Sequence, residues 1–131
     1  MNNVKVAAKI YNLDEPTRNG RLYTEKALRE AFNNKAFIDM NEHNAIPIMT
    51  EDGDIVGTAH CSLDYPTINI EGVINNCFED VLKDAALTHS GCGYVEYDAE
   101  NDRQIVTDYK LCELLLSSAA YVDCSMEVVK E

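Results

Sequence analysis

The sequence predicts an α+β fold with a small, mostly antiparallel, barrel-like core of about six or seven strands and two flanking helices. Three observations favour this class. Short segments of alternating apolar residues are separated by turn formers, which is typical of strands joined as hairpins. Two other segments carry apolar residues at helical spacing. The regular alternation of one strand with one helix that a parallel α/β sheet needs is missing.

The N-terminal third predicts one strand, one loop and one helix. Residues 4–11 form the strand, with Val4, Val6, Ala8 and Ile10 on one face. Residues 12–20 are rich in turn formers and predict the loop. Thr24 suits a helix N-cap, and Asn33 and Asn34 close the helix. Its apolar face is formed by Ala27, Leu28, Ala31 and Phe32.

The middle of the chain predicts a short strand followed by a hairpin. Residues 38–45 are expected to be a connection, and residues 46–49 a short strand that ends at the turn "EDGD". Residues 55–63 and 67–74 alternate on either side of "DYP" and form the predicted hairpin.

The C-terminal half predicts one more helix and several strands. Asn75 or Asn76 caps the second helix, whose apolar stripe is Phe78, Val81, Leu82 and Ala85. The segment "THSGCGYVEYD" is expected to turn into a strand at residues 93–97. Residues 104–111 and 120–129 are further strands, while residues 114–118 fit either a helical turn or irregular chain.

Length, net charge, apolar runs and cysteine spacing limit the kinds of domain, partner and cofactor that this chain can have. The 131 residues fit a single domain spanning residues 1–131. A net charge of −12 repels nucleic acid, and we expect no nucleic-acid partner. No apolar run is long enough for a membrane span or a signal peptide, so synthesis in a cytoplasm and no membrane partner are expected. The five cysteines are scattered without a CxxC pair, which predicts mostly buried thiols, no metal and no cofactor.

Four segments, in order, resemble the prohead maturation proteases of tailed phages and the herpesvirus assemblins. They are "TRNGRLYTEKALREAF" at 17–32, "IPI" at 46–48 followed by "DIVGTA", the hairpin and helix in "INIEGVINNCFEDVLKDAAL", and "ALTHSGCGYV". The resemblance covers about residues 4–122. It implies the prohead-protease fold and, in an active member, a serine nucleophile with a histidine base, which in the herpesvirus branch a second histidine orients.

The resemblance places the catalytic positions on residues of the wrong chemistry. The first histidine falls at Glu51 or Asp52, and the nucleophile at Thr88 or, with a shift, Ser90. The second histidine falls near Leu111. A carboxylate is a weaker base than imidazole, and a leucine cannot orient a base by hydrogen bonding. The sequence therefore predicts a degenerate triad on a retained fold.

Other residues could still support catalysis. His60, in the predicted strand 55–63, is the alternative base, although a strand histidine in a polar pocket is the simpler interpretation. His43 is expected at the surface. His89 and Ser90 are neighbours, and in extended chain neighbours point to opposite faces, so they are not expected to pair. The segment "SGCG" fits either an oxyanion turn or a glycine-rich entry to a strand.

Three hypotheses follow from the sequence. The first is a non-enzymatic virion structural or assembly protein, a minor or decoration component of the capsid, made in the host cytoplasm. Its partners are the major capsid protein or other virion proteins, and a homo-oligomer is compatible with it. The second is an active serine protease that cleaves capsid or scaffold proteins through Ser90 or Thr88 with His60. The third is an unrelated α+β domain.

Overall fold

The structure is a computed structural model that describes residues 3–17, 20–75, 85–117 and 123–129. Within these residues, eight strands and two helices follow one another. They are β1 (Asn3–Tyr11), β2 (Arg21–Tyr23), α1 (Glu25–Phe32), α2 (Lys35–Glu42), β3 (Ile46–Thr50), β4 (Ile55–Asp64), β5 (Thr67–Asn75), β6 (Ala86–Asp98), β7 (Arg103–Ser117) and β8 (Asp123–Val128).

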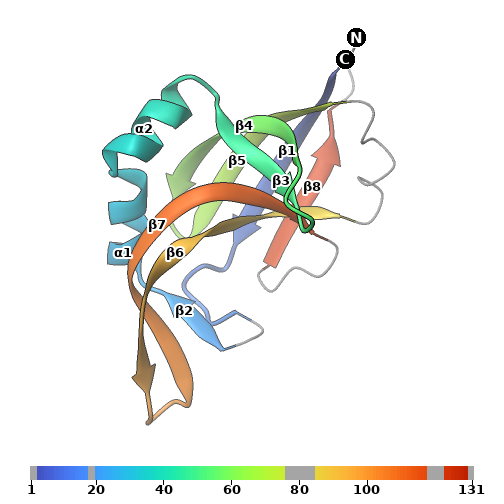
Figure 1. Ribbon diagram of the computed structural model, residues 1–131. Helices are drawn as coiled ribbons and strands as arrows, with labels where there is room; N and C mark the ends of the chain where they lie inside the picture. The colour runs from blue at the N-terminus through green and yellow to red at the C-terminus, as the bar shows by residue number, and fades with distance from the viewer. Residues whose placement is uncertain (1–2, 18–19, 76–84, 118–122, 130–131) are drawn as a thin grey trace.

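The strands form one strongly curled sheet. Its order is β2-β7-β3-β4-β5-β1-β8, and β6 pairs with β7 off this path. Every pairing is antiparallel except those of β2 and β3 with β7, which are parallel. The sheet curls so far that β6 approaches β8 and β1 (Figure 1). The result is a half-barrel with one inner and one outer face.

Strand β7 bends because it carries two extra residues relative to β6. The register skips Cys112 between the pairs Ser90–Glu113 and Gly91–Leu111, and it skips Thr107 near the tip. Bulges of this kind bend a strand and increase its twist. Gly91 and Gly93 of β6 lie between the two bulges, where a Cβ atom would come within 1.9 Å of a β7 carbonyl oxygen at either position. The close approach of the two strands therefore requires glycine.

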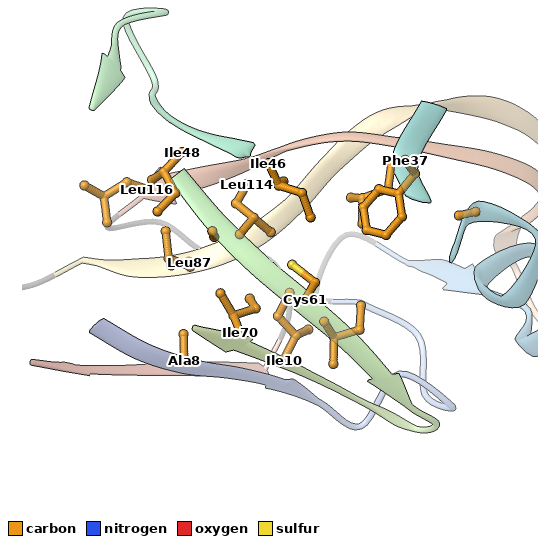
Figure 2. Packing of buried hydrophobic residues seen from close by; sticks show 14 of the residues in the cluster. Ala8, Ile10, Phe37, Ile46, Ile48, Cys61, Ile70, Leu87, Leu114 and Leu116 are labelled. Carbon is orange, nitrogen blue, oxygen red and sulfur yellow. The ribbon is translucent and has the colours of Figure 1, made fainter. Parts of the chain in front are cut away.

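The core lies between the two arms of the curled sheet. Figure 2 shows Ile46 and Ile48 of β3 with Leu114 and Leu116 of β7 on one side, and residues of β1 and β5 on the other. The side chains buried almost completely include Ile10, Ile46, Ile48, Ile68, Ile70, Ile74, Leu87 and Leu114. Burial of such side chains stabilises each by roughly 1.5–3 kcal/mol relative to exposure.

Helices α1 and α2 lie at one end of the half-barrel (Figure 1). Thr24 caps α1, because its side-chain oxygen accepts a hydrogen bond from the Ala27 amide at 3.1 Å. Asn33 ends α1, and the next residue, Asn34, caps α2 through the amides of Ala36 and Phe37. Two short helices therefore follow one another with no intervening loop. Phe37, Leu28 and their apolar neighbours join the core.

Asn41 fastens α2 to β4. Its side-chain amide donates to the Cys61 carbonyl and accepts from the Cys61 amide, both at 2.8 Å. Its own carbonyl oxygen accepts a hydrogen bond from Nδ1 of His60 at 3.0 Å. Strand β3 begins to pair with β4 at Ile46 and Ala59. At Cys61, two residues further along β4, the Asn41 side chain takes the place of a β3 residue.

Much of the predicted fold is confirmed. The class is mostly antiparallel β with two helices and a curled, barrel-like sheet. The first strand buries Val6, Ala8 and Ile10, as its alternation predicts. The first helix, the short strand at Ile46, the "EDGD" turn and the β4–β5 hairpin also lie where expected. The predicted second helix, from residue 75 or 76 to residue 85, falls almost entirely outside the described residues.

Three local predictions are wrong, and one strand was missed. The expected connection at 38–45 is largely the helix α2, which Asn34 begins. The expected turn at 88–92 belongs to the first half of β6. Residues 114–117 continue β7 and are neither a helical turn nor irregular chain. The short strand β2 was not predicted.

We expect Asn41→Ala to lower the free energy of unfolding by about 1–3 kcal/mol, because it leaves the partly buried amide and carbonyl of Cys61 without partners. Urea denaturation measures this. Glu42→Ala, at the exposed neighbouring position, is the control and should change stability by less than about 0.5 kcal/mol. Equal losses in the two variants would show that the Asn41 contacts contribute nothing specific.

Candidate functional site

The residues matched to the nucleophile and the first histidine lie on one face of three adjacent strands. Thr88 pairs with Leu115 and Ser90 with Glu113, while Thr50 of β3 pairs with Leu116. Residues two apart on a strand share a face. We therefore define an outer stripe on the outer face of β3, β7 and β6. It consists of Glu51, Ser117, Leu115, Thr88, Glu113 and Ser90.

At one end of the outer stripe, Glu51 accepts a hydrogen bond from Ser117 at 2.5 Å. Ser117 is only 6% exposed, whereas Glu51 is exposed. The pair joins the β3–β4 turn to the end of β7. Hydrogen bonds to a charged carboxylate are stronger than those between neutral groups. At the position matched to a catalytic histidine, the chain thus has a carboxylate that holds the turn in place.

At the other end, the Ser90 hydroxyl donates to Glu113 at 2.9 Å. The bulge at Cys112 places Glu113 on the outer face opposite Ser90. Thr88 lies between the two pairs, beside Leu115. A hydroxyl becomes a good nucleophile when a neutral imidazole removes its proton. Here the two serine hydroxyls of the stripe are hydrogen-bonded to carboxylates, which are weaker bases.

The remaining matched positions do not complete a catalytic group. Asp52 lies exposed in the β3–β4 turn. Leu111 is 4% exposed and faces the core, on the opposite side of β7 from the outer stripe. On the outer face, the β7 neighbours of Thr88 and Ser90 are Leu115 and Glu113. An orienting group matched to the second histidine is therefore missing from this face as well.

His60 lies in a separate place. It projects from β4 opposite Glu71 and lines a groove of about 460 Å³ together with Lys5, Thr58 and Asn44. Since the Asn41 carbonyl can only accept, Nδ1 of His60 must donate, and Nε2 of the neutral ring is then an acceptor. Strands β3 and β7 separate β4 from β6 in the sheet, so the structure does not bring His60 to Ser90.

His89 faces inward, opposite to Ser90, as the alternation predicts. It is 7% exposed, and its Nδ1 lies 2.7 Å from the Tyr109 hydroxyl. The ring of Tyr23 packs perpendicular to it at 4.6 Å. Nε2 of His89 is buried with no hydrogen-bond partner among the described residues. Burial lowers the pKa of His89 to about 4, so the ring is neutral at pH 7.

The third histidine and the "SGCG" segment have structural roles. His43 ends α2, is exposed, and has its Nδ1 2.8 Å from the Asp39 carbonyl. The segment from Ser90 to Gly93 is regular strand, so the oxyanion-turn interpretation is wrong. Its glycines serve the close approach of β7.

The cysteines are less buried than the sequence predicted. Cys61 is buried, which raises its thiol pKa to about 12. Cys124 is partly exposed, and Cys92 and Cys112 are exposed on the outer face of β6 and β7. Cys77 lies outside the described residues.

The described residues hold no group of three or more histidine, cysteine, aspartate or glutamate side chains that could bind a metal ion. None of the helices in this part of the chain is long and apolar enough to cross a membrane. Comparison of the chain with models of protein families, with curated proteins and with solved structures found no match.

Three features of these sites were not predicted from the sequence. Glu113 as the partner of Ser90, Asn41 as the clamp on His60, and the Tyr23–His89–Tyr109 cluster all depend on contacts across the sheet. The alternation of side chains predicts that His89 and Ser90 face opposite sides of the sheet. The bulge that aligns Glu113 with Ser90 cannot be predicted from the residue pattern.

We expect stability to fall between pH 6.5 and pH 4 because of His89. In this window the unfolded chain binds a proton that the buried ring in the folded state does not, so the free energy of unfolding decreases as the pH falls. The shift corresponds to about 3 kcal/mol over the whole window. Denaturant unfolding at several pH values measures the effect.

His89→Gln keeps a polar contact for Tyr109 but has no titrating ring, so its stability should fall less across the same window. His43→Gln, at an exposed histidine, should keep the wild-type pH profile. If wild type and His89→Gln lose stability in parallel from pH 6.5 to pH 4, the acid sensitivity comes from other groups.

Proposed function

We propose that this chain is a non-enzymatic structural or assembly protein of a tailed-phage virion, built on a degenerate prohead-protease fold. In this proposal it is a minor or decoration component bound to the capsid. The observation that carries the proposal is the outer stripe. In this stripe, Glu51, matched to the base, accepts a hydrogen bond from Ser117. Ser90, matched to the nucleophile, donates one to Glu113.

The placement of the three histidines supports the same proposal. His89 is buried on the inner face, His60 is held by Asn41, and His43 ends α2. None of the hydrogen bonds described above for the three imidazoles reaches Ser90 or Thr88. A serine protease needs its base within hydrogen-bond reach of the nucleophile. The outer stripe is therefore better suited to holding strands together than to acyl transfer.

A surface for binding a partner lies at the far end of the sheet. We define the β6–β7 arm as residues 91–110; Figure 1 shows its tip extending beyond β2, which pairs with residues 104–106. Tyr94 is 74% exposed, Tyr97 65% and Val95 43%. Exposed aromatic side chains of this kind are frequent anchors of protein–protein interfaces. Within the described residues, β6 has no strand partner on its other edge.

The charge and order of the arm indicate the kind of partner. The arm carries five acidic residues, Glu96, Asp98, Glu100, Asp102 and Asp108, against Arg103 and Lys110. Its tip is internally bonded, because Tyr97 donates to Asp102 at 2.6 Å and Arg103 pairs with Asp98 at 3.3 Å. A preformed acidic and aromatic tip fits a basic patch of the major capsid protein.

The active protease remains the second candidate, with Ser90 or Thr88 as nucleophile and His60 as base. The observation in its favour is the orientation of His60, whose Nε2 is left as an acceptor beside the groove. A productive dyad would require His60 and Ser90 to meet across β3 and β7, or a second copy to supply one of them.

We expect purified mature particles to contain the full-length chain at a fixed ratio to the major capsid protein, because a bound structural component follows the symmetry of its lattice. Quantitative mass spectrometry of particles measures this ratio. Absence of the chain, or only cleaved fragments, would contradict a structural role in the virion.

A fluorophosphonate probe separates the two candidates. The pure chain should remain unlabelled, as should Ser90→Ala and Thr88→Ala. Labelling of the wild type that is lost in Ser90→Ala or Thr88→Ala and in His60→Ala would establish the protease instead.

We expect Tyr94→Ala to weaken binding to capsids assembled without this chain by roughly tenfold or more, the usual loss at an interface anchor. Tyr11→Ala is the matched control, since Tyr11 is 40% exposed on β1, away from the arm. Sedimentation with capsids measures binding, and added salt should weaken it further. Equal losses for the two variants, or binding that is insensitive to salt, would contradict docking through the arm.

A further inference from the structure

Two exposed cysteines lie side by side at the root of the β6–β7 arm. Cys92 is in β6 and Cys112 is in β7. Sγ of Cys112 lies 3.7 Å from the carbonyl oxygen of Lys110, the residue that pairs with Cys92. Burial and the nearby Cys92 raise the pKa of the Cys112 thiol. Twenty residues separate them in sequence, so the fold, and not chain proximity, brings them together.

The bulge in β7 explains how the two thiols meet. Cys92 pairs with Lys110, and residues two apart share a face, so Cys112 belongs to the same face as Lys110 and Cys92. Cys112 is also the residue that the register skips. A skipped residue has no cross-strand partner of its own and lies on a bent strand, so its side chain is available to the diagonal neighbour Cys92.

We propose that Cys92 and Cys112 form a reversible intramolecular disulfide that closes the root of the arm. The site is independent of the virion role proposed above. Both cysteines are exposed and therefore accessible to an oxidant, and the Cys112 thiol lies beside Lys110, which pairs with Cys92. Bond formation requires the two sulfur atoms to approach to about 2.05 Å. Rotation of the two side chains, with a shift of the bent strand at the bulge, would bring them together.

The reaction balances with a disulfide oxidant such as oxidised glutathione. One thiolate of the pair attacks glutathione disulfide, forming a mixed disulfide and releasing one glutathione. The second thiol then loses its proton and displaces the other glutathione. Two protein S–H bonds are lost, one S–S bond forms, and two molecules of reduced glutathione leave.

The other cysteines of the described residues are less well placed to form this disulfide. Cys61 is buried in the core at 1% exposure and bonded through its backbone to Asn41. Cys124 is on β8, which pairs with β1. Among the described cysteines, Cys92 and Cys112 are therefore the pair best placed to form a disulfide.

The test uses the full chain, reduced and then equilibrated with increasing ratios of oxidised to reduced glutathione. Free thiols are trapped with an alkylating reagent, and peptides are mapped without reduction. We expect Cys92 and Cys112 to lose alkylation together and to appear in one linked peptide pair. The link should disappear on return to reduced glutathione.

Variants establish the identity of the pair. Cys92→Ser should leave Cys112 alkylated or carrying glutathione, and Cys112→Ser should do the same to Cys92. Cys124→Ser and Cys61→Ser are controls that should preserve the link. The proposal is overturned if wild type accumulates glutathione on either cysteine without the linked peptide. It is also overturned if both thiols stay free at the highest oxidant ratio, or if either links to a different cysteine.

Discussion

Pairing along β7 is the constraint on which the rest of the structure depends. This strand is antiparallel to β6 on one edge and parallel to both β2 and β3 on the other. Thr24, the cap of α1, also donates its hydroxyl to the Val106 carbonyl. A straight β7 could not satisfy all of these neighbours and still cover the core. Its two bulges and the facing glycines of β6 provide the bend.

The same bend determines what each part of β7 can do. Near its C-terminal end, Leu114 and Leu116 face the core and Ser117 holds the β3–β4 turn. Past Leu111, toward the tip, Tyr109 and Val106 still face the core, whereas the outer face of β7 and the paired residues of β6 meet solvent. One face of β7 thus belongs to the packed core from Val106 to Leu116, while the strand also carries the exposed residues of β6 and the tip. The outer stripe lies near the C-terminal end of β7, and the exposed thiols lie at the root of the β6–β7 arm.

Sequence patterns predicted the elements that obey simple periodicity. The strand from Asn3 and the β4–β5 hairpin alternate cleanly, and Thr24 has the chemistry of a cap. Helix α2 was missed because eight residues with Phe37 as the buried one give a weak helical pattern. The first half of β6 was missed because serine and glycine are typical of turns, whereas those glycines are needed for close contact between strands.

For the candidate site, alternation predicted that the side chains of His89 and Ser90 point to opposite faces. Their partners, Tyr109 and Glu113, depend on register across the sheet and could not be predicted.

The parallel pairing of β2 with β7 has a consequence for the order in which the chain folds during synthesis. Strands β1, β3, β4 and β5 pair among themselves within residues 3–75 and can assemble early. Arg21 of β2, however, pairs with Gln104, and β3 gains its second neighbour only from residues 114–116. Contacts so distant in sequence form slowly. While the ribosome is still making β7, the free edge of β3 and the apolar face of α1 lack the strand that later covers them. The emerging chain is therefore most prone to misassociation just before its last strands appear.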